Sequence, residues 1–173
     1  VFVFLVIINA INFIDGIDGL AITEVIKTII LIEFFSAKQT ALTTLSILLV
    51  LSLLPLYYFN YKKKRKVFLG DGGSLLLGTI VSVYVFNILG NEYEFNYGFE
   101  INKALFAVLV ILYPLLDLLR VFILRVKEGK SPFEADQKHL HHKLLLKQKN
   151  HFFVTLTIIL IQFLIVLFYL ITI

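Results

Sequence analysis

The chain has 173 residues, of which 59% are hydrophobic, and its mean hydropathy is +0.91. Soluble domains contain roughly 45–50% apolar residues, so this composition excludes an ordinary soluble domain and indicates an integral membrane protein. The sequence has no cysteine, which excludes disulfides and thiolate metal sites, and its formal net charge of +4 fits the basic loops of a membrane protein rather than a nucleic-acid interface.

Six stretches are apolar enough to form membrane helices, because about 20 mostly apolar residues span a bilayer. They cover residues 1–11, 20–36, 41–60, 75–90, 104–124 and 152–173. The chain begins inside the first stretch and ends inside the last. We therefore predict an all-α polytopic bundle and a single integral-membrane domain over 1–173, which is a fragment of a larger protein truncated at both ends.

The loops between these stretches alternate in charge. Residues 61–66, YKKKRK, carry five cations and residues 125–150 carry seven, whereas residues 37–40 carry one and residues 91–103 are mainly acidic. Basic loops lie on the cytoplasmic side of membrane proteins. The pattern predicts a plasma-membrane protein whose basic loops, together with residues 12–19, face the cytoplasm.

The stretch NAINFIDGIDGLA, residues 9–21, places Asn12, Asp15 and Asp18 between two apolar stretches. Ionisable groups near the membrane interior are expensive and usually functional, and carboxylates suit Mg²⁺. Gly16 favours an irregular backbone, in which this segment would line a polar cleft. The simpler interpretation is a turn in which Asp18 caps the following helix.

The stretch FLGDGGSLLLG, residues 68–78, surrounds Asp71 with glycines. Glycine allows close approach of the backbone to a ligand, and a helix N-terminus attracts phosphate. We expect Ser74 to cap a helix that begins at residue 75. The alternatives are a capped loop without a ligand and, for Phe68, a ring that faces lipid rather than a nucleobase.

The stretch SPFEADQKHLHHKLL, residues 131–145, contains His139, His141 and His142 among several lysines. Cationic and hydrogen-bonding side chains suit a diphosphate or a phosphorylated lipid, and this histidine spacing is not typical of zinc. The alternative is an amphipathic interfacial loop that meets only anionic headgroups, which explains the lysines but not the three histidines.

Two acid–base pairs lie at i, i+3 spacing within predicted helices. Asp117 and Arg120 are expected to form a structural ion pair. For Glu24 and Lys27 the same interpretation and a functional one remain equally open, because charged groups inside membrane helices are often functional.

Taken together and in this order, the three quoted stretches resemble the polyprenyl-phosphate N-acetylhexosamine-1-phosphate transferases. These are polytopic membrane enzymes that begin bacterial cell-envelope glycan assembly, and the SPFEAD…HLHH form is similar to the branch that uses UDP-N-acetylglucosamine or a related sugar. The resemblance implies transfer of a sugar phosphate from a UDP-sugar to a polyprenyl phosphate such as undecaprenyl phosphate, with release of UMP. The implied partners are therefore the UDP-sugar, the lipid phosphate and the membrane, without nucleic acid, and an oligomer is compatible with the pattern.

The resemblance also implies roles for the polar residues of these stretches. Asn12 and Asp71 would bind Mg²⁺, with Mn²⁺ as the alternative metal. His139, His141 and His142 would hold phosphates or the sugar.

The catalytic roles implied by the resemblance fall on the two aspartates of the first stretch. Asp15 would lie beside the diphosphate as a base or an electrostatic organiser. Asp18 would contact the uracil, with Phe68 stacking on it. The family also carries an adjacent pair of aspartates in an earlier cytoplasmic loop, which would precede Val1, so we expect the fragment to lack part of the site and to be inactive alone.

Two other functions are weighed against this one. A CDP-alcohol phosphotransferase needs an arginine soon after its first Asp-Gly pair, and DGIDGLAITEV has none. A transporter or channel segment would use buried acids to relay ions and would show acids near the midplane and inverted repeats. Most acids of this chain instead fall at one predicted membrane face.

Overall fold

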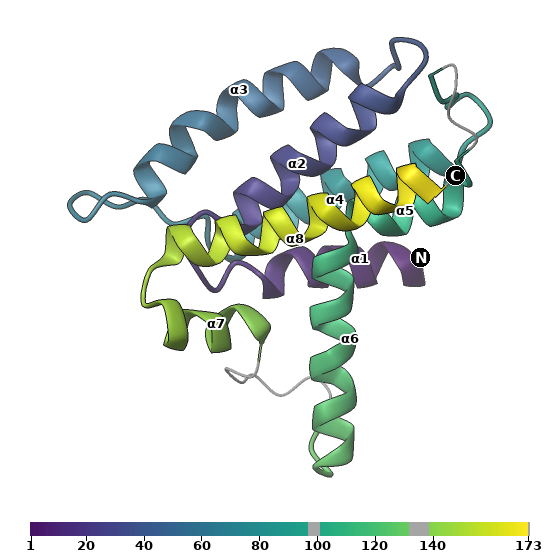
Figure 1. Cartoon of the computed structure of the whole chain (residues 1–173). Coiled ribbons are helices and arrows are strands. Elements are labelled where there is room, and N and C mark those ends of the chain that lie inside the picture. The colour runs from purple at the N-terminus through teal and green to yellow at the C-terminus, as the bar shows by residue number, and fades with distance from the viewer. Residues whose placement is uncertain (97–100, 132–138, 173) are drawn as a thin grey trace.

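The structure is a computed structural model that describes residues 1–96, 101–131 and 139–172. These residues form eight helices, and their only strand-like feature is one bridge pair between Ser36 and Phe95. The helices are α1 (Phe2–Phe13), α2 (Leu20–Phe35), α3 (Thr43–Asn60), α4 (Gly70–Leu89), α5 (Lys103–Val110), α6 (Leu112–Lys127), α7 (Leu140–Gln148) and α8 (His151–Thr172). Figure 1 shows α2, α4 and α8 running in similar directions while α6 projects away from them.

The all-α prediction is confirmed, but six membrane spans are not shown. Among the described residues, α3, α4 and α8 are long and apolar enough to cross a membrane, and α5 with α6 would be a fourth span, bent by 76°. Helix α1 is apolar but has only 12 residues. Helix α2 has 16 residues and includes charged side chains.

The core forms around α2, which packs against α3, α4, α5 and α8, while α1 packs mainly along α4. Helix α1 approaches α4 most closely at Gly78. A Cβ atom added at Gly78 would lie 2.8 Å from Cα of Ile8 and 2.9 Å from its carbonyl oxygen. Only a residue without a side chain therefore allows the two helix backbones to cross at this distance.

Contacts between the loops show that they lie at two opposite ends of the helices. At one end Lys38 pairs with Glu94, with 2.7 Å between Nζ and Oε2. At the other end the backbone N–H of Gly19 donates to Oδ1 of Asn60 (2.6 Å). The first quoted stretch and the basic run that follows Asn60 therefore share one end of the bundle, as the charge pattern predicts.

The break between α5 and α6 falls at Ile111, whose φ and ψ of −119° and 27° are not helical. A break frees backbone groups that need other partners inside a membrane. The N–H of Tyr113 donates to Oε1 of Gln162 on α8 (3.4 Å), and Pro114 next to it has no N–H to satisfy. Because of the bend, α6 projects away from the other helices (Figure 1).

We predict that Gly78→Ala destabilises the protein by about 1–3 kcal/mol, because the added methyl group meets backbone atoms of α1 that cannot move aside cheaply. The matched control is Gly72→Ala on the same helix, where a Cβ atom meets nothing within 4 Å. Since alanine favours a helix by up to about 1 kcal/mol over glycine, the control should be neutral or stabilising. Thermal unfolding in detergent measures both, and equal shifts would contradict the close crossing.

Candidate functional site

The acidic loop, residues 14–19, joins α1 to α2 and depends on glycine at its end. Gly19 has a φ of +75°, in the left-handed region that favours glycine. A Cβ atom at Gly19 would also lie 2.3 Å from Cε2 of Tyr61. The loop is thus pressed against the end of α3, where Tyr61 follows the last helical residue.

Asp18 is already paired within the protein. Its Oδ2 accepts a hydrogen bond from Nζ of Lys66 (2.6 Å), and its backbone N–H donates to Nδ1 of His151 (3.0 Å). The expected alternative, in which Asp18 caps α2, is not what the structure shows, because the N-cap residue is Gly19 and no side-chain cap bond forms. Asp18 therefore links the acidic loop to the basic run and to the start of α8.

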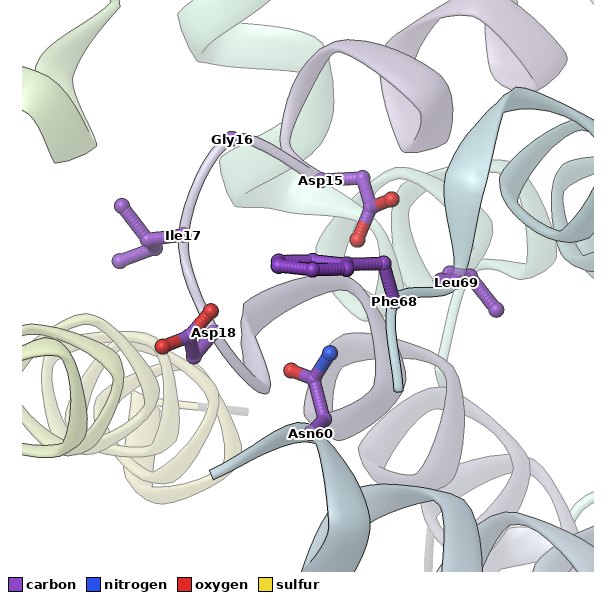
Figure 2. Close-up of a pocket in the computed structure, with 7 residues that line it drawn as sticks. All are labelled: Asp15, Gly16, Ile17, Asp18, Asn60, Phe68 and Leu69. Atoms are coloured by element: carbon purple, nitrogen blue, oxygen red, sulfur yellow. The ribbon is translucent and has the colours of Figure 1, made fainter. Parts of the chain in front are cut away.

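A pocket of about 80 Å³ opens beside the acidic loop (Figure 2). Its lining residues are Asp15, Gly16, Ile17, Asp18, Asn60, Phe68 and Leu69. Figure 2 shows the Phe68 ring within the curve of the loop, between the carboxylate of Asp15 and the amide of Asn60. The ring is 68% exposed, and Nζ of Lys66 lies 4.8 Å from its centroid. Three of the predicted site residues, Asp15, Asp18 and Phe68, thus share one pocket.

Asp15 occupies the most unfavourable electrostatic position of the acidic loop. Burial, and after it the negative charges of Asp71 and Asp18, raise its pKa from 3.8 to about 6. Asp71 is exposed in the first turn of α4. The carboxylate of Asp71 is therefore near enough to act on Asp15, and three acids from two segments share one region.

Asn12 joins the first two quoted stretches directly. Its Nδ2 donates to Oγ of Ser74 (2.7 Å). The expectation that Ser74 caps a helix from residue 75 is wrong, because α4 begins at Gly70 and Ser74 lies within it, buried. The helix takes in the whole GDGGS segment. Asp71 consequently lies at the helix N-terminus, close to α1.

The histidine cluster, His139, His141 and His142, packs against the acidic loop from the other side. A Cβ atom at Gly16 would lie 2.6 Å from Nε2 of His141 and 3.0 Å from Nε2 of His142. His141 is fully buried, and its ring centroid lies 4.4 Å from that of His142. Residues 132–138 of the third quoted stretch lie outside the described residues.

Several side chains of this region were not singled out by the sequence. Asn60 and Lys66 bind the acidic loop, and His151 accepts its backbone N–H. Asp117 forms the ion pair with Arg120 that the sequence predicts, with 3.7 Å between Oδ1 and Nη1, but its closer contact with His139, 2.8 Å between Oδ2 and Nδ1, was not predicted. The available signals were weak: Asn60 precedes a basic run, and His151 is an isolated histidine at the start of an apolar stretch.

The donor atoms fit a hard divalent cation near the acidic loop. Carboxylate and amide oxygens are the ligands that Mg²⁺ prefers. Because Nδ2 of Asn12 donates to Ser74, its Oδ1 is the atom that would face a cation. The pKa of Asp15 is raised first by burial and then by the charges of Asp71 and Asp18, and a bound cation would offset that repulsion.

A second group of candidate metal ligands occurs among the described residues. One ligand atom each from Asp117, His139 and His141 lies within 4.8 Å of the others. The 2.8 Å between Asp117 and His139 is a hydrogen-bond distance, so these two groups bind each other directly. This group is separate from Asn12 and Asp71, the predicted metal ligands.

Comparison with known proteins gives one family and several relatives. The model of glycosyl transferase family 4 matches residues 1–89. The undecaprenyl-phosphate alpha-N-acetylglucosaminyl 1-phosphate transferase of Pasteurella multocida is 34% identical over 99 residues, which cover 54% of this chain and 26% of that protein. The decaprenyl-phosphate N-acetylglucosaminephosphotransferase of Mycobacterium leprae is 33% identical over 93 residues, or 51% of this chain and 23% of that protein.

A third relative, the undecaprenyl-phosphate alpha-N-acetylglucosaminyl 1-phosphate transferase of Escherichia coli, is 28% identical over 111 residues, or 62% of this chain. The chain spans about a quarter of the length of the curated relatives it matches, 26% for the first. No solved structure matches. Because the family model matches residues 1–89 of the 173, the chain belongs to glycosyl transferase family 4, whose members among its relatives are polyprenyl-phosphate N-acetylglucosamine-1-phosphate transferases.

Proposed function

We propose that the protein transfers a HexNAc-1-phosphate from a UDP-sugar to a polyprenyl phosphate, in the first membrane step of cell-envelope glycan synthesis. The observation that carries the proposal is the convergence of the acidic loop, the start of α4 and the histidine cluster. Asp71 raises the pKa of Asp15 from one side, and His141 packs on Gly16 from the other. A diphosphate bound with its cation needs carboxylates near the cation and hydrogen-bonding groups near the phosphate oxygens. The acidic loop with Asp71 would supply the former, and the histidine cluster the latter.

In the proposed reaction a phosphate oxygen of the lipid forms a bond to the β-phosphorus of the UDP-sugar. The bond from this phosphorus to the bridging oxygen breaks, and UMP leaves with that oxygen and its electron pair. Phosphoryl transfer of this kind depends mainly on positioning and on neutralising charge. The protein therefore needs no covalent intermediate.

Asp15 is suited to act on the attacking lipid phosphate. Its pKa of about 6 is close to the second pKa of a phosphate monoester, about 6. A carboxylate with this pKa accepts a proton from a singly ionised phosphate near neutral pH, when the two groups meet. Asp15 would thereby leave the phosphate fully ionised for attack.

The pocket beside the acidic loop would hold the uridine. A volume of about 80 Å³ has room for a ring but not for a whole nucleotide sugar. Phe68 offers a ring face for stacking, and Asp18 offers acceptor oxygens for an N–H of the base. The sugar and the diphosphate would then extend from the pocket toward the histidine cluster, whose members would bind them.

Asn12 and Asp71 would hold Mg²⁺, or Mn²⁺ in its place, and the cation would neutralise the charge of the diphosphate during transfer.

The same proposal includes the orientation of the protein in the membrane. The basic run of residues 61–66 and the histidine cluster would face the cytoplasm at the plasma membrane. The chain would form part of one membrane domain with six membrane segments, α1 and α2 included.

We predict that Asp71→Asn lowers turnover by at least about 10³-fold, since a carboxylate that binds the cation is lost. Asp71 is exposed, so the variant should fold. The measurement is formation of radiolabelled lipid-linked sugar from UDP-HexNAc, polyprenyl phosphate and Mg²⁺ by the full-length protein in detergent. The control is Glu92→Gln, an exposed acid just beyond the other end of α4, which should turn over at the wild-type rate.

Wild-type turnover by Asp71→Asn would remove the metal-ligand role. A wild-type protein that forms no labelled lipid with any UDP-HexNAc, but carries ions in liposomes, would overturn the proposed function. The transporter interpretation would then replace it.

We predict that Asp15→Asn raises thermal stability at pH 7.5 in a chelator, by an amount that shrinks toward about pH 4.5. The folded-state pKa of Asp15, about 6, lies above its model value of 3.8, so between these values the folded protein binds more protons than the unfolded chain. The free energy of unfolding of the wild type therefore falls as pH rises through this window, and the variant lacks this loss.

Adding Mg²⁺ at pH 7.5 should narrow the difference, because a bound cation offsets the repulsion among the three acids. Melting temperatures of both proteins, with Glu92→Gln as the control, measure the effect. A difference between variant and wild type that does not change with pH would contradict the perturbed titration of Asp15.

A further inference from the structure

Asp117 carries a buried carboxylate that the proposed reaction does not use. It is 2% exposed on α6, just after the bend of the broken helix pair. A buried carboxylate is strongly unfavourable unless hydrogen bonds satisfy it. Two partners of the Asp117 carboxylate lie at the start of α7. Its Oδ1 accepts from the backbone N–H of Leu140 (2.8 Å), and its Oδ2 lies 2.8 Å from Nδ1 of His139.

The contact with His139 fixes where that side chain carries its proton. An ionised carboxylate only accepts hydrogen bonds, so at 2.8 Å the proton of the pair must lie on Nδ1 of His139. The other ring nitrogen, Nε2, is then the one available to a ligand.

His141 is held from the same side. Its Nδ1 lies 3.1 Å from Oη of Tyr113 and 3.6 Å from Oδ2 of Asp117, and its ring stacks on that of His139 with centroids 5.3 Å apart. Its Nε2 faces Gly16 and, among the described residues, has no hydrogen-bond partner although it is buried. A buried nitrogen without a hydrogen-bond partner is unfavourable, and a phosphate or sugar oxygen at the acidic loop would satisfy it.

We propose that Asp117 is a positioning residue, which holds the proton of His139 on Nδ1 and keeps the histidine cluster turned with its Nε2 side toward the acidic loop. The bend between α5 and α6 makes this arrangement feasible, because it sets the direction of α6, on which Asp117 lies against the start of α7. This inference rests on the proposed function, in which the cluster binds phosphate or sugar. Asp117 itself would touch neither substrate.

The test compares Asp117→Asn with Glu24→Gln in the full-length protein. Asparagine keeps the size of the side chain and can still accept from Leu140, but its Nδ2 can only donate to His139 and so drives the proton to Nε2. We expect kcat to fall on the order of 10²-fold and the KM for the UDP-sugar to change by less than about threefold. Glu24→Gln is an equally buried acid-to-amide change on α2, whose carboxylate binds Lys27 and Gln162 rather than a histidine, and it should keep the wild-type kcat.

A double substitution separates positioning from a merely structural role. If Asp117 acts through His139, then adding Asp117→Asn to His139→Gln should lower kcat no further. If the kcat losses of the two single variants multiply in the double variant, the proposal is overturned. Wild-type kinetics of Asp117→Asn would also overturn it.

A spectroscopic readout tests the same point without turnover. In ¹⁵N-histidine-labelled protein, the signal assigned to His139 by its loss in His139→Gln should report a protonated Nδ1, and Asp117→Asn should move the proton to Nε2. A wild-type His139 protonated only on Nε2 would overturn the proposal. So would a bound transition metal that purifies with the wild type and is lost in Asp117→Asn. If the wild type makes no lipid-linked sugar, the proposed function fails while this readout still decides the role of Asp117.

Discussion

The candidate site depends on close contacts to the acidic loop that only glycine permits. The histidine rings approach one side of the loop at Gly16, and the ring of Tyr61 approaches the other at Gly19. A side chain at Gly16 would push the histidine cluster away from the acidic loop, and one at Gly19 would push the end of α3 away from it. The backbone of the loop is thereby clamped between α7 and the end of α3, and Asp15 and Asp18 are presented at fixed places along it.

Charge is distributed unevenly over this clamped loop. Asp18 is neutralised by Lys66, whereas Asp15 faces the like charge of Asp71 and has a pKa raised to about 6. The histidine cluster is likewise anchored on one side, because Asp117 and Tyr113 contact the Nδ1 atoms and leave Nε2 of His141 without a partner among the described residues. Among the described residues, the buried Nε2 of His141 thus lacks a partner where the histidine cluster faces the acidic loop, which is where a ligand with oxygens and its cation would enter.

The sequence predicted the helical class and the grouping of the three motifs, because charge alternation and apolar run length are local properties. It did not predict the bend at Ile111 or the start of α4 at Gly70, since both are decided by packing against other helices. The i, i+3 rule found the Glu24–Lys27 pair, with 2.6 Å between its charged atoms. The same rule paired Asp117 with Arg120, but it could not see His139, which comes close only through the fold. The count of six spans is not shown for a related reason: α1 and α2 are apolar but short.

Helix α8 hydrogen-bonds to the rest of the structure near its start and again at Gln162. Its first residue, His151, accepts the backbone N–H of Asp18, and Gln162 bonds to Glu24, to Lys27 and to the N–H freed at the broken helix. A gene product cut short by a stop codon after the histidine segment would keep every recognisable motif. It would nevertheless lose the α8 side chains that bind the acidic loop and the broken helix. A search for motifs alone would therefore class as functional an allele whose candidate site has lost its structural support.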